Sequence, residues 1–317
     1  MAVYTPVSRT DLTGFLRAYD IGRLQDHAAI AEGIENSNYR LETDRGRFIL
    51  TLYEKRVREA DLPFFLALMS HLQESGLPCP RPVAGRDSIV LRRLNGRPAA
   101  IVTFLPGKAV ARPDTARTRA AGAVLARLHE AARGFAGSRA NDLGPCGWRK
   151  LHEDCRARAG EVKPGLADIV GRELDFLERA WPGNLPRGVI HGDLFPDNVL
   201  YEGARVSGVI DFYFAAEDML AFDLAICLNA WCFAGGEFLP AHARALVAGY
   251  EDVRPLGPAE RAALPVLARG AAMRFLLTRL YDWLHPEPDA LVTPKDPLGF
   301  LERLRFHQRS NWLSALA

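Results

Sequence analysis

The hydrophobic pattern changes near residue 105, and this change restricts the fold more than any other feature of the 317-residue sequence. Before this point, apolar and polar residues alternate in short runs, which is typical of β-strands. The expected strands are 38–43, 48–53, 88–91 and 99–104, and the expected helices in this part are 8–19 and 60–74. After it, apolar residues recur every three or four positions, which is typical of helices. The expected helices are 118–132, 172–180, 241–253, 258–285 and 298–316.

A change of this kind favours an α+β protein built from two lobes. We expect a small β-rich lobe over residues 1–105 and a larger, mainly helical lobe over residues 106–317. The segment Leu105-Pro-Gly-Lys between them has the composition of a connector. One large domain is the alternative that a chain of this length allows.

The composition is that of an ordinary globular protein, with 48% hydrophobic and 25% charged residues. The 40 lysines and arginines almost balance the 38 aspartates and glutamates, so the formal net charge is only +2. This balance argues against nucleic acid or an anionic membrane as a partner and favours a small molecule. The most apolar late stretch, 219–233, is too short to span a bilayer and contains Asp223.

The five cysteines are scattered along the chain and never form a C-x-x-C pair. An odd, scattered set favours neither a disulfide framework nor a zinc site. The first residues lack the apolar run of a signal peptide. We therefore expect a cytoplasmic protein without a membrane span.

Three polar residues, Asp193, Asn198 and Asp211, stand in turns next to short apolar runs. The expected strands around them are 189–190, 199–201 and 206–210. A carboxylate, an amide and a second carboxylate suit a hard, oxygen-ligated cation beside a reacting hydroxyl, as in Mg²⁺-dependent phosphate chemistry. One aspartate can orient or deprotonate the hydroxyl while the asparagine and the other aspartate hold the metal.

The spacing of these residues matches that of a protein-kinase catalytic loop, which carries H-R-D-x-x-x-x-N followed by D-F-G. Here His191-Gly-Asp193 precedes Asn198 at the same spacing, and Asp211-Phe-Tyr occupies the place of D-F-G. Each aspartate alone would be an ordinary turn residue. The combination predicts phosphoryl transfer.

The stretch His191-Gly-Asp-Leu-Phe-Pro-Asp-Asn198 resembles the signature of the aminoglycoside-phosphotransferase-like kinases. The whole chain resembles one family among them, the bacterial homoserine kinases. The segments that carry this resemblance are 2–8, 33–39, 48–54, 62–66, 187–200, 210–215 and 274–282. The last segment lies outside the shared kinase core, so it points to the family and not only to the fold.

The resemblance implies a two-lobed protein-kinase-like fold, with a nucleotide-binding first lobe and a second lobe for catalysis and acceptor binding. It also implies ATP-dependent phosphorylation of the L-homoserine side-chain hydroxyl, giving O-phospho-L-homoserine for threonine biosynthesis. Asp193 would orient that hydroxyl and accept its proton. Asn198 and Asp211 would coordinate Mg²⁺ that bridges the ATP phosphates. ATP and Mg²⁺ are thus the expected cofactors.

The loop at 33–38 would cover the phosphates, although it has one glycine where protein kinases carry G-x-G-x-x-G. The expected strand 48–53 places Thr51 where kinases carry a lysine, and the helix 62–72 has no glutamate to face it. The expected nucleotide contacts are Gly33, Asn36, Ser37, Asn38 and Thr51. The candidates to neutralise the α- and β-phosphates are Arg47, Lys55 and Lys108.

Homoserine carries a carboxylate, which arginine binds best, and an ammonium group, which an acidic or aromatic side chain can bind. Residues of these types follow Asp211 or share one expected helix. The candidates are Tyr213, Asp218, Arg274, Arg279, Tyr281 and Asp282. The alternative for the helix is amphipathic packing with ion pairs on its surface.

Other polar residues have structural explanations. We expect His129 to be a hydrogen-bonded core residue, and His191 to brace the loop without moving protons. Asp223 is costly to bury alone, so we expect it to be paired and to tie the catalytic loop. Cys227 and Cys232 are expected core thiols.

Three other functions are compatible with the sequence. A kinase of the same fold could act on an aminoglycoside, choline or a sugar, because acceptor specificity lies outside the shared loop. The near-neutral charge argues against a polycationic aminoglycoside. The missing strand lysine is compatible with a nucleotide-binding pseudokinase, and the His-Gly-Asp string with a metal-dependent phosphohydrolase.

Overall fold

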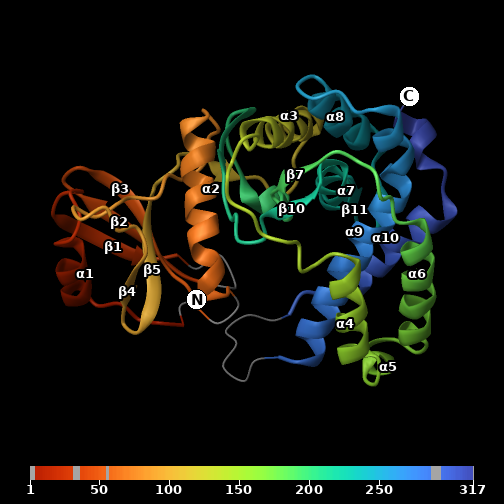
Figure 1. The fold of residues 1–317 in the computed structure, drawn as a ribbon, viewed down its shortest axis with the longest axis horizontal. Helices are drawn as coiled ribbons and strands as arrows, with labels where there is room; N and C mark the ends of the chain where they lie inside the picture. Colours follow the sequence, from red (N-terminus) through yellow and green to blue (C-terminus); the bar gives the residue numbers. More distant parts are fainter. Residues whose placement is uncertain (1–3, 31–35, 55–56, 287–293, 317) are drawn as a thin grey trace.

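The computed structural model describes residues 4–30, 36–54, 57–286 and 294–316 and has two lobes side by side (Figure 1). The smaller lobe contains an antiparallel sheet in the order β1-β2-β3-β5-β4. Its strands are β1 (Leu24–Ala29), β2 (Ser37–Thr43), β3 (Gly46–Leu52), β4 (Arg92–Leu94) and β5 (Arg97–Thr103). Its helices are α1 (Arg9–Leu16) and α2 (Leu62–Glu74), the latter preceded by the 3-10 helix η1 (Glu59–Asp61).

Both faces of this sheet are apolar, and one helix covers each face. In β5, Ala99 and Ile101 belong to the core around Leu12 of α1. Their neighbours Ala100 and Val102 belong to the core around α2. Since successive residues of a strand point to opposite faces, α1 and α2 lie on opposite sides of the sheet, and α2 stands between the sheet and the larger lobe (Figure 1).

The larger lobe is mainly helical. Its helices are α3 (Thr115–Ala131), α4 (Pro145–Cys155), α5 (Ala159–Val162), α6 (Leu166–Ala180), α7 (Leu220–Trp231), α8 (Pro240–Glu251), α9 (Pro258–Leu284) and α10 (Leu298–Arg309). Short strands form a three-stranded sheet in the order β6-β8-β9 and the pairs β7–β10 and β11–β12. They are β6 (Lys108–Ala109), β7 (Arg187–Ile190), β8 (Val199–Glu202), β9 (Arg205–Val209), β10 (Ala216–Met219), β11 (Phe233–Ala234) and β12 (Glu237–Phe238).

The α+β fold with a β-rich first part and a helical second part confirms the fold class predicted from the sequence. The strand expected at 88–91 is wrong, because these residues follow a turn and β4 begins only at Arg92. Asp87 accepts a hydrogen bond from the Ile89 backbone (3.2 Å), and Ser88 has a φ of +65°, so the chain turns here. The helix expected at 298–316 ends at Arg309 and is followed by the 3-10 helix η3 (Trp312–Leu316).

The predicted lobe boundary at residue 105 falls between β5 and β6. The larger core cluster extends from α2 to α10, so α2 shares its apolar contacts with the helical lobe. In the part of the chain that the structure describes, no helix combines the length and the apolar character needed to cross a bilayer.

Candidate active site

The catalytic loop runs from the end of β7 to the start of β8 and brings Asp193 and Asn198 together. Asn198 closes the short 3-10 helix η2 (Pro196–Asn198). Its Nδ2 donates to the Asp193 backbone oxygen (2.8 Å) and to Asp193 Oδ2 (3.3 Å). These bonds use the amide nitrogen, so they do not engage the amide oxygen, which is the atom that binds cations.

Asp211 follows β9 and lies beside this loop. The Ile210 backbone donates to the Asn198 carbonyl (3.0 Å), and the Ile210 carbonyl bonds His191 Nε2 (3.0 Å). Asp211 has a φ of +66°, a strained backbone for a residue other than glycine, and such strain is common at functional sites. Burial raises the pKa of Asp211 to about 6, and the nearby charge of Asp197 adds to this shift.

Asn198 and Asp211 supply the oxygen donors that Mg²⁺ prefers. Asp211 Oδ1 is buried and has no hydrogen-bond partner among the described residues, and a bound cation would satisfy it. The described residues contain no cluster of three or more His, Cys, Asp or Glu side chains suited to a metal. Mg²⁺ needs few protein ligands where phosphates and water supply the others. The two residues therefore fit a cation that binds together with a nucleotide.

Asp223, in the first turn of α7, holds the catalytic loop from behind. Its carboxylate accepts hydrogen bonds from the backbone N–H groups of His191 (2.7 Å) and Gly192 (3.0 Å) and lies 3.1 Å from His129 Nε2. Burial alone would raise the pKa of Asp223, but its hydrogen bonds to His129 and to the His191 backbone hold that pKa below its ordinary value. The predicted pairing of Asp223 and the core role of His129 are confirmed.

His191 braces the loop, as the sequence predicts. Its Nδ1 accepts from the Asp193 backbone (3.2 Å), its Nε2 bonds the Ile210 carbonyl, and its ring packs on Phe212 at 4.9 Å. Burial lowers the pKa of His191, so the ring is neutral at pH 7.

Gly192 and Arg274 support the same loop. Gly192 has a φ of +76°, and a Cβ at this position would lie 2.8 Å from the Phe214 carbonyl oxygen. Arg274, a buried residue of α9, donates from Nη1 to the Gly192 carbonyl, and its guanidinium lies 4.7 Å from the Phe275 ring centre. Burial lowers the pKa of Arg274, against the opposing charge of Asp193. The structure therefore gives Arg274, a candidate for substrate binding, a place beneath the loop.

The described residues expected to contact the nucleotide already form hydrogen bonds within the smaller lobe. Ser37 is buried, donates to Glu54 Oε1 (2.7 Å) and accepts from the backbones of Tyr4 (2.9 Å) and Thr5 (3.1 Å). A nucleotide contact through this hydroxyl would have to replace one of those bonds. Gly33 and Lys55 lie outside the described residues.

Thr51 stands at the position of the kinase strand lysine and makes only a neutral contact in the described structure. Its hydroxyl donates to Asn38 Oδ1 (2.8 Å). Asn36 Oδ1 accepts from the backbone of Glu54 (3.3 Å). Of the two described cations suggested for the phosphates, Arg47 packs over the Phe104 ring at 4.2 Å and Lys108 is exposed in β6.

The other acceptor candidates lie in different places. Asp218, in β10, accepts from Asn141 Nδ2 (2.7 Å) and from the Met219 backbone (2.7 Å), so it holds structure together. Tyr213 is close to the site, with its hydroxyl 3.2 Å from that of Tyr53. Tyr281 packs against His285 at 4.5 Å and is partly exposed.

Asp282 and Arg279 belong to the same helix, α9, but have different neighbours. The pKa of Cys155, at the end of α4, is raised by burial first, then by the charge of Asp154 and then by that of Asp282. Asp282 therefore lies near the end of α4. Arg279 Nη1 donates to the Asp296 carbonyl (3.3 Å), and its guanidinium lies 4.5 Å from the Phe300 ring centre. The sequence did not point to Arg303, which packs on the same ring.

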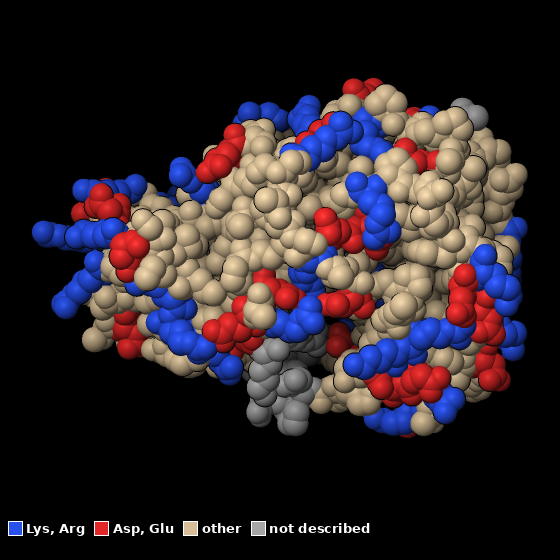
Figure 2. All heavy atoms as spheres, in the orientation of Figure 1, with Lys and Arg blue, Asp and Glu red and all other residues tan. Residues whose placement is uncertain are grey.

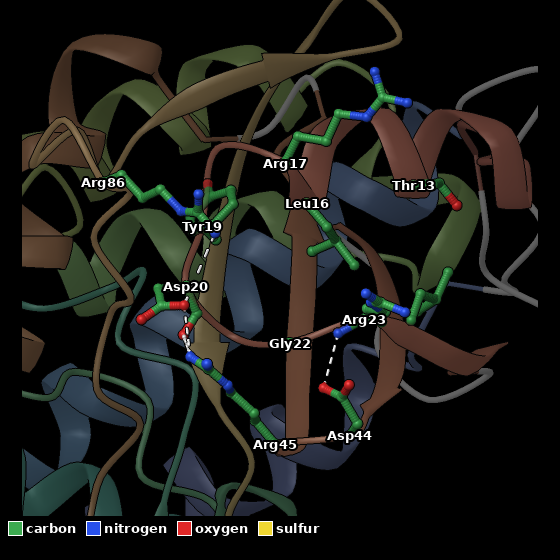
Figure 3. A pocket seen from close by; sticks show the side chains of 11 residues that line it. Thr13, Leu16, Arg17, Tyr19, Asp20, Gly22, Arg23, Asp44, Arg45 and Arg86 are labelled. Atoms are coloured by element: carbon green, nitrogen blue, oxygen red, sulfur yellow. Dashed lines mark hydrogen bonds and ion pairs between the residues drawn. The ribbon is translucent and has the colours of Figure 1, made fainter.

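A pocket of about 470 Å³ lies elsewhere, in the smaller lobe, among α1, β1 and the β2–β3 turn (Figure 3). Both of its carboxylates are engaged: Arg45 bonds Asp20 (2.5 Å), and the Arg23 backbone donates to Asp44 (2.9 Å). No residue of the catalytic loop lines this pocket, so it is separate from the candidate active site.

Comparison with known proteins identifies relatives over most of the chain. A family model described as "Phosphotransferase enzyme family" matches residues 26–256. The homoserine kinase of Rhodospirillum rubrum is 58% identical over 309 residues, which are 97% of this chain and 96% of that protein. The homoserine kinase of Xanthobacter autotrophicus is 57% identical with the same coverage.

Solved structures share the fold at low sequence identity. A microcompartment-associated aminopropanol kinase has a TM-score of 0.75 at 18% identity, covering 98% of this chain and 99% of that one. An amicoumacin kinase in complex with AMP-PNP and Ca²⁺ has a TM-score of 0.72 at 14% identity, covering 96% and 95%. The chain therefore belongs to the phosphotransferase enzyme family, beside the homoserine kinases that it matches over nearly their whole length.

Proposed function

We propose that this chain is a homoserine kinase, which transfers the γ-phosphoryl group of ATP to the side-chain hydroxyl of L-homoserine. The observation that carries the proposal is its identity of 58% and 57% to two homoserine kinases along nearly their whole length. The product would be O-phospho-L-homoserine, an intermediate of threonine biosynthesis. All five cysteines are free thiols, which fits a cytoplasmic enzyme.

Asp193 is the proposed catalytic base. In the transfer, the substrate oxygen forms a bond to the γ-phosphorus while the bond from that phosphorus to the β,γ-bridging oxygen breaks, leaving ADP. The proton of the substrate hydroxyl passes to the Asp193 carboxylate. Asn198 holds that carboxylate in place through its Nδ2, so the base is oriented before the substrate arrives.

Asn198 and Asp211 are the proposed ligands of Mg²⁺, which would neutralise charge on the transferring phosphates. The buried, unpartnered Oδ1 of Asp211 supports this assignment. Behind them, Asp223 and Arg274 bind the backbone of the loop and keep it from shifting. In this proposal, the residues of the chain contribute to catalysis by positioning the reacting groups and by supplying Asp193 as an oriented base.

Coupled ADP release with ATP and Mg²⁺ tests the proposed substrate. The acceptors to compare are L-homoserine, L-serine, L-threonine, choline and kanamycin. We expect turnover that depends on L-homoserine and greatly exceeds that with the others. Turnover with another acceptor and none with homoserine would keep the kinase and reject the substrate. ATP binding without turnover on any of them would favour a nucleotide-binding pseudokinase.

A further inference from the structure

Arg279 of α9 and Arg303 of α10 meet at one aromatic ring. Their guanidinium carbons lie 4.5 Å and 4.3 Å from the centre of the Phe300 ring. Phe300 stacks on Phe275 of α9, with ring centres 5.1 Å apart and planes inclined by 26°. Each of the two helices therefore places one guanidinium group against the same aromatic ring.

The contacts between aromatic rings extend from α9 and α10 to the catalytic loop. Phe195, two residues after Asp193, contacts the rings of Phe275 (4.9 Å) and Phe300 (6.4 Å). Burial lowers the pKa of Arg279. Nearby carboxylates oppose this shift, and the charge of Asp193 has the largest effect among them. The arginine pair thus lies on the side of the catalytic base formed by the helical lobe.

Among the residues that the structure describes, Arg279 and Arg303 form no ion pair with a carboxylate, unlike other arginines of this lobe. Arg269 forms two bonds of 2.6 Å with Glu173, and Arg254 bonds Glu260 at 2.9 Å. Within the described residues, Arg303 Nη1 is buried without a hydrogen-bond partner, and Arg279 bonds only a backbone carbonyl.

The guanidinium groups of Arg279 and Arg303 are close enough for their charges to repel. Burial and the charge of Arg279 together lower the pKa of Arg303 to about 10. Placing unpaired charges in such surroundings is unfavourable unless a counterion completes the site. A carboxylate would fit, because two guanidinium groups can each donate in-plane hydrogen bonds to its oxygens.

We propose that Arg279 and Arg303 together bind the α-carboxylate of the amino-acid substrate and so determine acceptor specificity. This inference rests on the proposed function, since it places the hydroxyl of the same molecule at Asp193. The phosphates of ATP are the competing anion, but the pair is carried by α9 and α10 and not by the sheet of the smaller lobe.

The test compares L-homoserine with 3-amino-1-propanol, which lacks only the carboxylate. For Arg303→Met and Arg279→Met we expect the KM for homoserine to rise about tenfold to a hundredfold, as for loss of a charged hydrogen bond. The KM for ATP should stay the same. The wild type should prefer homoserine over 3-amino-1-propanol, and each variant should lose most of this preference. Arg303→Lys, which keeps the charge but not the fork, should lie between.

A competition measurement does not depend on turnover of the poorer acceptor. 4-Hydroxybutyrate keeps the carboxylate and lacks the ammonium group, so it should compete with homoserine in the wild type and much less in Arg303→Met. The matched control is Arg309→Met, an exposed arginine in the last turn of α10, which should behave as the wild type in both measurements.

The outcomes separate this inference from the proposed function. Unchanged homoserine KM in both methionine variants, with turnover retained, would overturn the carboxylate site and leave the function intact. A rise in the KM for ATP alone would assign the pair to phosphate and also overturn it. If the wild type phosphorylates an acceptor without a carboxylate in place of homoserine, the proposed function and the carboxylate site both fail.

Discussion

Asp193 owes its position to buried hydrogen bonds on the far side of its loop. Asp223 accepts two consecutive backbone N–H groups of that loop, and Asn198 donates to Asp193 itself. A carboxylate fixed in this way needs little reorganisation when the substrate binds, and such preorganisation lowers the barrier to transfer. The proposed role of Asp193 as the base would thus depend on Asp223, which binds the backbone of the loop.

Replacing Asn198 with alanine removes both a proposed Mg²⁺ ligand and the amide that holds Asp193. We expect the Mg²⁺ concentration for half-maximal turnover to rise about tenfold to a hundredfold, with a fall in kcat. Steady-state rates over a Mg²⁺ titration measure both quantities. Asn311→Ala, at an exposed position, is the control. An unchanged Mg²⁺ requirement would rule out Asn198 as a ligand.

His307, in α10, is a buried group with a direct effect on acid stability. Its Nε2 lies 3.1 Å from Asn229 Oδ1, and burial together with the charges of Arg269 and Arg303 lowers the pKa of His307 to about 3. The unfolded chain binds a proton here near pH 6.5, and the folded chain does not. We therefore expect the free energy of unfolding to fall as the pH drops below about 6.5. At pH 4 this one group should lower it by about 3 kcal/mol.

Urea unfolding at pH 7 and pH 4 measures this contribution. His307→Gln keeps an amide donor for Asn229 but cannot take up a proton. We expect the variant to lose less free energy of unfolding between the two pH values than the wild type, even if it is less stable at pH 7. Equal losses in both proteins would show that His307 is not the group responsible.

The sequence predicted those residues whose partners are near in the chain. The proximity of Asp193 and Asn198 could be predicted from their spacing, because a local hydrogen bond joins the two residues. Arg274 was suggested as a substrate ligand, yet its partner Gly192 lies 82 residues earlier and no spacing rule links them. Arg303 carries no motif at all, since only the meeting of α9 and α10 brings it to Phe300.

At the scale of elements, close contact between α3 and α8 depends on glycine. A Cβ on Gly122 of α3 would overlap the Leu246 carbonyl, and one on Gly249 of α8 would overlap the Arg119 carbonyl. The two backbones thus approach more closely than side chains would allow. The same two helices are also joined by a hydrogen bond between His129 of α3 and Tyr250 of α8 (2.8 Å).

Gly122→Ala and Gly249→Ala should therefore force the two helices apart. We expect each to lower the free energy of unfolding by about 1–3 kcal/mol. The control is Gly299→Ala in α10, where no other atom lies within 4 Å of the new Cβ. There the higher helix propensity of alanine should be neutral or add up to about 1 kcal/mol. Calorimetric unfolding measures all three, and equal stability of the α3 and α10 variants would contradict the packing described.

The periodic helices could be predicted, but the element beneath the catalytic loop could not. α3 and the first half of α9 alternate buried and exposed positions, so their apolar faces are visible in the sequence. α7 is buried on almost every side and so has no polar face to reveal its period. β1 has a mixed burial pattern and no clear alternation, which explains why the sequence did not predict it.

At the scale of the whole molecule, the two lobes are joined by more than their connector. α2 packs on the sheet and shares the core of the helical lobe, and the Tyr53 and Tyr213 hydroxyls lie 3.2 Å apart across the junction. Positive and negative side chains are interspersed on the face seen in Figure 2, in keeping with the formal net charge of +2. Neither sign of charge dominates this face, so we expect a small substrate to be bound by local groups such as Arg279 and Arg303.

Identification of the product by ³¹P NMR tests most directly the claim that Asp193 drives phosphoryl transfer to homoserine. The wild type and Asp193→Ala are incubated with ATP, Mg²⁺ and L-homoserine, and nucleotide binding is measured on both. We expect O-phospho-L-homoserine and ADP from the wild type, and a rate lower by about 10²- to 10⁴-fold from the variant with ATP binding retained. Product at the wild-type rate from the variant would contradict the role of Asp193, and no phosphohomoserine from the wild type would contradict the function itself.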